Sequence, residues 1–328
     1  SAPPWPPQPP WQPAASLPTL RLRAQLLAAA RQFFAERAVL EVDTPALVRH
    51  PVTDPNLHCA EVRLPGQAAP LFLHTSPEYA MKRLLAAGSG DIYQIAHVFR
   101  AEEASRLHNA EFTLIEWYRC GHSMRELMLE TAQLAGALLA LPASAPVQFL
   151  HYAEAFERAL GCDPLSAPQA QLRALALEHH LDARTTALCN REELLDWLMG
   201  TVVGPGLGQQ QLCLLHHYPA AQAALARLDP QDPRLALRFE LYFRGVELAN
   251  GFEELCDAAE QRRRFQADQA ELHRRGQPPR PIDEALLAAL AHGLPPVSGV
   301  ALGFDRVLML RTGARDLSEV MAFPLERA

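Results

Sequence analysis

Hydrophobic residues in the first third of the chain change their spacing from element to element. From residue 20 to residue 38 they recur every three or four positions, among them Leu22, Leu26 and Phe33, which predicts a helix with one buried face. The next run, VLEVDTPALV, predicts a strand. Further on, LFLHTSPEYAMKRLLAAG predicts a strand, a turn and a helix, and two more strands follow in DIYQIAHVFRAEE and EFTLIEWYR.

The rest of the chain predicts helices near 124–140 and 164–200, strands in LRFELYFRGVELANGF, a polar helix at 257–276, and a final strand and helix in SGVALGFDRVLML. These strands follow one another without regular βαβ alternation. That favours an α+β fold, with a mostly antiparallel sheet flanked by helices. Eight prolines among the first 18 residues predict an extended arm. We therefore expect an arm at 1–18 and a single catalytic domain at 19–328.

Polar residues stand in the middle of several predicted strands. Because alternate residues of a strand face opposite sides, each strand sorts into two sets. The sets that carry charge are Gln94, Ala96, Arg100 and Glu102; Phe112, Leu114, Glu116 and Tyr118; and Glu240 and Tyr242. One such charge is ordinarily a salt bridge at a sheet edge. Charges on several strands are costly unless a ligand satisfies them, so together they predict a polar floor for a charged substrate.

Composition narrows the class of protein. The net charge is -7 and no basic run occurs, so the chain lacks the electrostatic pattern of a strong nucleic-acid binder. Its six cysteines are scattered without a C-x-x-C pair, which is typical of reduced thiols in the cytoplasm. No apolar run is long enough to span a membrane, and no signal peptide pattern occurs. We expect a cytoplasmic protein.

The polar residues suit particular ligands. Arg100 and Arg306 carry guanidinium groups that pair with phosphates. Glu240 and Glu247 suit Mg²⁺, which prefers carboxylates together with substrate phosphates, and Phe112 offers a flat face for a base. Three further carboxylates suit ammonium groups: Glu78, Glu116 and Glu254. This set predicts a site for a nucleoside triphosphate and a cationic small molecule.

Five segments, in order, carry a family resemblance. VLEVDTPAL, FRAEEASRLHNAEFTLIEWYR and VALGFDRVLML resemble motifs 1, 2 and 3 of the class II aminoacyl-tRNA synthetases, and motif 1 belongs to the dimer interface of that family. HTSPEYAMKRLL and RFELYFRGVELANGFEEL are similar to the lysyl subgroup, the second of them with high specificity. The resemblance covers roughly residues 20–328.

One feature separates this chain from the lysyl-tRNA synthetases. Motif 1 begins near residue 39, preceded only by a helix and the proline arm, so we expect no anticodon-binding barrel and no tRNA partner. Such a core resembles the elongation factor P β-lysine ligases. This resemblance implies a cytoplasmic, homodimeric, AMP-forming enzyme that uses ATP and Mg²⁺. It would activate (R)-β-lysine as an adenylate and transfer it to a lysine side chain of elongation factor P.

The resemblance also implies roles for individual residues. Arg100 and Arg306 would be catalytic, at the α- and γ-phosphates; Phe112 would stack on adenine, with Glu102 and Asn109 at the adenine end. The implied ATP-binding set is Arg100, Ala101, Glu102, Asn109, Phe112, Glu247, Leu248, Gly303 and Arg306, with Glu240 and Glu247 as Mg²⁺ ligands. The implied amino-acid-binding set is Ser76, Pro77, Glu78, Glu116, Tyr118, Asn250, Glu254 and Ala301.

Ala301 stands where lysyl-tRNA synthetases usually have glycine. Its methyl group would crowd the α-amino group of ordinary lysine, whereas a β-amino acid avoids it. Two other functions stay open. One is a truncated lysyl-tRNA synthetase or another lysine-adenylate-forming enzyme with a different acceptor. The other is an inactive paralogue that only binds, and it ranks last because no arginine or glutamate of motifs 2 and 3 is lost.

Overall fold

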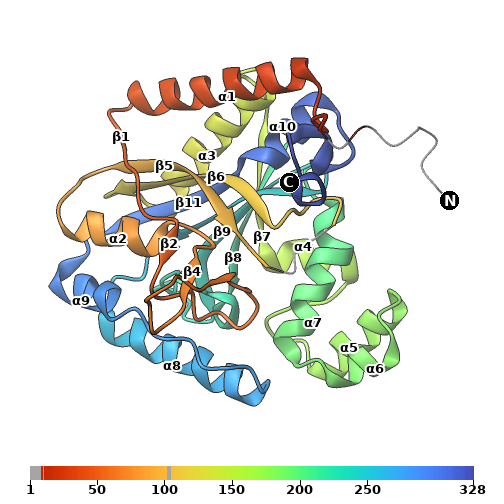
Figure 1. Cartoon of the computed structure of the whole chain (residues 1–328). Helices are drawn as coiled ribbons and strands as arrows, with labels where there is room; N and C mark the ends of the chain where they lie inside the picture. Colours follow the sequence, from red (N-terminus) through yellow and green to blue (C-terminus); the bar gives the residue numbers. More distant parts are fainter. Residues whose placement is uncertain (1–8, 10, 102–104) are drawn as a thin grey trace.

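An eight-stranded sheet forms the centre of the protein (Figure 1). The structure, a computed structural model, describes residue 9 and residues 11–101 and 105–328. In spatial order the strands are β1 (Leu40–Glu41), β5 (Ile92–Phe99), β6 (Glu111–Cys120), β11 (Val297–Gly303), β10 (Val246–Glu253), β9 (Leu235–Phe243), β8 (Leu212–Pro219) and β7 (Val147–His151). A small second sheet has the order β2 (Leu47–Val48), β4 (Leu71–Leu73) and β3 (Glu61–Val62).

The antiparallel sheet expected from the sequence is confirmed for the six inner strands, and both edges differ. β1 pairs with β5 in parallel, and β7 pairs with β8 in parallel. Parallel neighbours need a long crossover connection. Here the small sheet and a helix lie between β1 and β5, and four helices lie between β7 and β8. The run predicted as one strand, VLEVDTPALV, is wrong in extent: it forms β1 and β2, which belong to different sheets.

Three helices cover one face of the sheet: α1 (Leu17–Ala35), α3 (Met124–Leu139) and α10 (Phe304–Thr312) (Figure 1). The strands turn alternate apolar side chains toward them. Trp117 of β6, Phe239 of β9 and Leu302 of β11 are fully buried in one large core with Phe34 of α1. The period of two in the strands therefore assigns this face to the core and leaves the polar residues for the other face.

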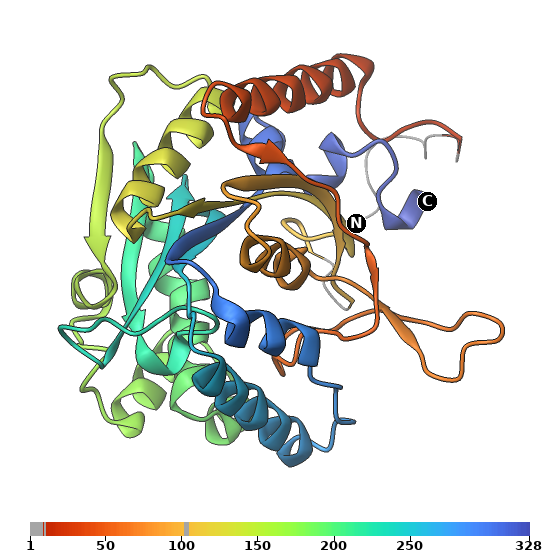
Figure 2. The same ribbon diagram turned by 90° about the vertical axis from the view of Figure 1, so that its left-hand side faces the viewer.

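Helices α2 (Glu78–Ala86), α8 (Ala258–Arg274) and α9 (Glu284–Gly293) pack together on the opposite side from α1 (Figure 2). Beyond β7 lie α4 (Tyr152–Leu160), α5 (Gln169–Glu178), α6 (Ala183–Leu188) and α7 (Arg191–Leu198). The helical region predicted at 164–200 is therefore three helices. Asp182 and Asn190 start α6 and α7: each side chain accepts a hydrogen bond from the backbone amide three residues further on.

The predicted arm at 1–18 overlaps the first helix by two residues. Ser16 caps α1 by accepting a hydrogen bond from the Thr19 amide, and a proline occupies its first turn. The amides of Ala14 and Ala15 donate to the carbonyl oxygens of Ala322 and Met321, so the segment before α1 packs on the C-terminal residues. All six cysteines are free thiols. Within the described ranges, no helix has the length and apolarity needed to cross a membrane.

Candidate active site

The polar residues predicted to share a face form a single row across five strands. Strand register pairs Gln94 of β5 with Glu116 of β6, Glu116 with Ala301 of β11, Ala301 with Asn250 of β10, and Asn250 with Glu240 of β9. Directly opposed residues point to the same side of a sheet. The polar floor expected from strand alternation is thus present, on the face away from α1, α3 and α10.

A cavity of about 780 Å³ lies above this floor. Most of the predicted amino-acid-binding residues line it: Ser76, Glu78, Glu116, Tyr118, Asn250, Glu254 and Ala301. Arg100 lines the same cavity. Its far wall comes from the loop of residues 52–57, from residues 220–225 and from α8. The structure therefore brings together residues that are up to 249 positions apart in the chain, from Val52 to Ala301.

Glu116 is a buried carboxylate in this cavity, with two hydroxyl partners. The Ser76 hydroxyl donates to Oε2 at 2.7 Å and the Tyr118 hydroxyl donates to Oε1 at 2.9 Å. Burial, reinforced by the charge of Glu78, raises the pKa of Glu116 to about 7. Burial also raises the pKa of Glu254. A cationic ligand would stabilise the ionised form of carboxyl groups whose pKa values are raised in this way.

Gly299 makes the close packing at this end possible. A Cβ atom there would lie 2.3 Å from the Tyr118 ring and 2.6 Å from Glu254 Oε1, too close for any side chain. Ala301 stands two residues further along β11, on the same face, and lines the cavity. Its register partner on β6 is Glu116, and its effect on the choice of amino acid stays a prediction.

Arg100 follows the end of β5 and lies over Phe112, with its guanidinium carbon 5.1 Å from the ring centre. Its Nε is buried and has no hydrogen-bond partner in the described part of the chain. A buried donor of this kind gains from an anionic ligand, so the residue fits a phosphate. Of its neighbours, Ala101 donates its amide to the His58 carbonyl at 2.8 Å, and Glu102 lies outside the described residues.

Arg306, in the first turn of α10, is held by three contacts. Its Nη1 donates to the Glu247 carbonyl at 2.9 Å and its Nε donates to the Leu107 carbonyl at 3.3 Å, while Nη2 lies 2.8 Å from His108 Nε2. The preceding Gly303 has no protein atom closer than 3.7 Å to the position a Cβ would take, apart from its chain neighbours. A Cβ atom at Gly303 would make ordinary contacts, at 3.7 Å, with Arg306 Cδ and the Leu248 carbonyl, so the need for glycine at this position stays a prediction.

SGVALGFDRVLML contains two adjacent charged residues, Asp305 and Arg306, and Asp305 is the buried one. It is 1% exposed, accepts the Thr113 amide at 2.6 Å and forms an ion pair with Arg23 of α1. Asp305 thus joins α10 to β6 and α1. That anchor sets the direction in which its neighbour Arg306 extends.

The two carboxylates predicted to bind Mg²⁺ have different surroundings. Glu240 is engaged at both oxygens: Arg238 contacts Oε1 at 2.6 Å and the Tyr242 hydroxyl donates to Oε2 at 2.7 Å. Among the residues that the structure describes, the carboxylate of Glu247 is paired with Arg306 alone, whose Nη1 lies 3.7 Å from its Oε2. Mg²⁺ at a nucleotide site is held by one or two carboxylates plus phosphate oxygens. The residues fit such an ion, with Glu247 as the more available ligand.

Both polar atoms of the Asn109 side chain already make hydrogen bonds within the protein. Its Nδ2 donates to the Glu111 carbonyl at 2.7 Å, and its Oδ1 accepts the Leu325 amide at 3.2 Å. The residue shapes the loop before β6 and ties it to the C-terminal segment. Its contact with adenine stays a prediction, as do the roles of Leu248 and Pro77.

Sequence reasoning missed several parts of the site. Arg238, two residues before Glu240 on β9, donates to Glu240 and to Asn250 Oδ1, and strand alternation could have identified it. The spacing of four residues on one helix indicates a pair between Lys82 and Glu78, but it does not indicate that Lys82 also reaches Glu254, at 2.6 Å. Nothing in the local pattern indicated that residues 52–57 would wall the cavity.

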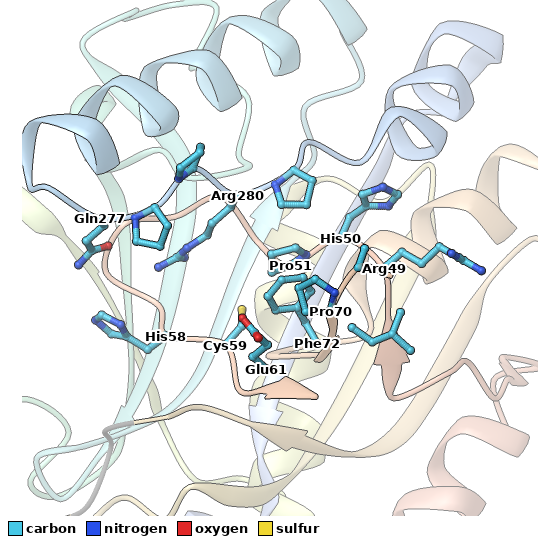
Figure 3. Close-up of a pocket in the computed structure, with 15 residues that line it drawn as sticks. Arg49, His50, Pro51, His58, Cys59, Glu61, Pro70, Phe72, Gln277 and Arg280 are labelled. Carbon is cyan, nitrogen blue, oxygen red and sulfur yellow. The ribbon is translucent and has the colours of Figure 1, made fainter. Parts of the chain in front are cut away.

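A second cavity, of about 720 Å³, lies beside the segment that follows β2 (Figure 3). It is lined by residues of the small sheet and of the proline-rich link between α8 and α9, and none of the predicted site residues lines it. Arg280 lines this second cavity and contacts the segment that walls the first. It donates to the carbonyl oxygens of Val52, Asp54 and Leu57, at 3.2, 2.7 and 2.6 Å, and so clamps the wall of the first cavity.

The central sheet flanked by helices, with a polar face beneath a cavity, agrees with a domain of the class II synthetase type. The comparison with known families agrees: residues 14–327 match the tRNA synthetases of class II (D, K and N), and the chain belongs to this family. It is 48% identical to the elongation factor P–(R)-β-lysine ligases of Hamiltonella defensa and Edwardsiella ictaluri, and 47% identical to that of Salmonella dublin. Each match covers 97% of this chain and 98% of the relative.

Proposed function

We propose that this protein activates (R)-β-lysine with ATP as an aminoacyl-adenylate and transfers the β-lysyl group to a lysine side chain of elongation factor P. The observation that carries the proposal is the polarity of the cavity. Arg100 lies over Phe112, which precedes Glu116 by four residues, roughly 13 Å along the strand. A molecule with ammonium groups at one end and a carboxylate at the other fits that separation. The relatives named above supply the identity of the amino acid and of the acceptor protein.

In the first step the substrate carboxylate attacks the α-phosphorus of ATP in line. A phosphorus–oxygen bond forms, the bond to the bridging oxygen breaks, and pyrophosphate leaves. Arg100 neutralises charge on the α-phosphate and Arg306 binds the γ-phosphate, so catalysis consists of positioning and electrostatic stabilisation. Mg²⁺, when bound, neutralises further phosphate charge; Glu247 would hold it, with Glu240 as the second carboxylate.

In the second step a neutral lysine amine of the acceptor attacks the carbonyl carbon of the adenylate. The carbon–nitrogen bond of an amide forms, the carbon–oxygen bond to the phosphate breaks, and AMP leaves. The amine gives up one proton, which the leaving phosphate or a water takes.

We further propose that the enzyme is a cytoplasmic homodimer that does not act on tRNA. Motif 1 contains β1, an edge strand on which the side chain of Leu40 is 55% exposed. An exposed apolar edge strand gains from pairing with a second copy. Six free thiols fit a reducing compartment. Light scattering is expected to give twice the chain mass of 36.2 kDa.

Two linked assays test the proposed function. ATP–pyrophosphate exchange, measured with (R)-β-lysine and with α-lysine, is expected to favour β-lysine. Acyl transfer is then measured to purified elongation factor P and to tRNA, and only the protein is expected to accept the label. If neither amino acid supports exchange, the proposed amino-acid-activating activity is refuted. Exchange followed by labelling of tRNA alone, or of neither acceptor, favours the alternative of a lysine-adenylate-forming enzyme with another acceptor.

A further inference from the structure

Lys82 is the only lysine in the chain, and it is buried behind the amino-acid end of the cavity. Its side chain is 2% exposed. The Nζ atom lies 2.6 Å from Glu78 Oε1, on the same helix, and 2.6 Å from Glu254 Oε2, just after β10. Both carboxylates line the cavity, whereas Lys82 does not. Each carboxylate therefore uses one oxygen to contact Lys82.

The charges at this end of the cavity do not balance within the protein. Three carboxylates, those of Glu78, Glu116 and Glu254, carry three negative charges when ionised, and Lys82 supplies one positive charge. Glu116 has hydroxyl partners only, and none of the ion pairs among the described residues includes it. Two negative charges thus remain for a ligand. Buried charges of like sign are unfavourable unless cations compensate them.

We propose that Lys82 is a specificity-determining residue that acts as a built-in ammonium group, compensating one of the three carboxylates and leaving two for the two ammonium groups of a diamino acid. The inference rests on the proposed function and deepens it, because it states why the pocket accepts two cationic groups. Lys82 is a positioning residue in this scheme: it contacts Glu78 and Glu254 and lies outside the cavity that holds the substrate.

Geometry separates this role from two simpler ones. An ion pair between two residues four apart on one helix would involve only Glu78. The contact with Glu254 instead joins α2 to the residue that follows β10. A lysine that filled the ammonium position of the substrate would line the cavity, and Lys82 does not. Burial lowers the pKa of Lys82, but the charges of Glu254 and Glu78 outweigh it and raise that pKa overall. The group is therefore a permanent cation.

The scheme predicts that loss of Lys82 shifts the pH dependence of KM. In the wild type, the raised pKa values of Glu116 and Glu254 mean that protons leave as the diamino acid binds, so KM falls as pH rises from 6 to 8. Without the cation of Lys82, the carboxyl groups hold their protons to higher pH. More protons then leave as the diamino acid binds, so KM of Lys82→Met keeps falling at pH values where KM of the wild type has levelled off. Among the described residues, Tyr79, Tyr118 and Cys256 are further titratable groups that face this cluster.

The experiment measures ATP–pyrophosphate exchange with (R)-β-lysine from pH 6 to pH 8. Lys82→Met is expected to raise KM at pH 8 by about tenfold or more while kcat changes little, since one partner of a buried ion pair is lost. The double variant Lys82→Met/Glu78→Gln removes one negative charge together with the positive one. It is expected to recover part of the loss at pH 8. Arg83→Met, at the next and exposed position of α2, is the matched control.

A second measurement does not depend on activity. In protein labelled with ¹⁵N-lysine, Lys82 gives the only side-chain lysine signal, which is expected to remain that of an ammonium group from pH 6 to pH 9. The inference is overturned if that signal titrates in this range. It is equally overturned if KM of Lys82→Met levels off at the same pH as KM of the wild type, or if the double variant has a higher KM at pH 8 than Lys82→Met. Loss of the proposed function is distinguishable, because the wild type itself would then show no exchange with β-lysine.

Discussion

Replacing Glu116 with glutamine is expected to stabilise the protein at alkaline pH and to abolish activation of β-lysine. Glu116 is 2% exposed, and its pKa is raised from 4.5 to about 7, mainly by burial. The folded protein therefore binds more protons than the unfolded chain between these values, so its free energy of unfolding falls as pH rises through that interval. The difference between about 7 and 4.5 corresponds to about 3 kcal/mol, most of it lost between pH 5 and pH 8.

Glutamine keeps the shape of the side chain but has no charge to bury. Glu116→Gln should therefore lack this pH-dependent loss, and its Tm at pH 8 should exceed that of the wild type by about 5 °C more than at pH 5. The assay is thermal unfolding without substrate at both pH values, with exchange activity measured in parallel. Glu111→Gln is the control, because Glu111 starts the same strand with a side chain that is 52% exposed. Equal Tm differences at pH 5 and pH 8 for Glu116→Gln would refute the reasoning.

Three further changes test other parts of the site. Ala301→Gly removes the methyl group at the amino-acid end, so the ratio of exchange with α-lysine to exchange with β-lysine should rise roughly tenfold, and an unchanged ratio contradicts the assigned role. Glu247→Gln should raise the Mg²⁺ concentration needed for half-maximal exchange more than Glu240→Gln does, because the Glu240 oxygens already hold Arg238 and Tyr242; equal Mg²⁺ titrations would argue against Glu247 as the main ligand. Arg280→Met releases three carbonyl groups of the cavity wall, which should lower the free energy of urea unfolding by about 1.5–3 kcal/mol and raise KM for β-lysine. Loss of stability with an unchanged KM would show that the clamp supports the fold alone.

Strand alternation predicted the polar face correctly, because it depends only on the direction of successive side chains along one strand. Glu116 and Tyr118 share a face for that reason, and the structure places both in the cavity. Helix boundaries inside 164–200 were not predicted, although Asp182 and Asn190 are residues that commonly start helices. The parallel edges of the sheet also escaped prediction. Whether β7 and β8 run in parallel depends on the path of the chain between them, which the pattern of either strand does not contain.

The sequence by itself determined the family, the order of the motifs and the side of each strand that carries charge. Only the tertiary structure decided which of those charges meet. Lys82, on a helix, contacts Glu254, which lies 172 positions further on and directly follows a strand, and Gly299 is required because Tyr118 and Glu254 both close over it. Register between strands is fixed by the packing of the whole sheet, whereas the period of two is a property of a single strand. For this reason the carboxylates of the site could be identified from the sequence. The excess of negative charge that they form together could be recognised only in the folded chain.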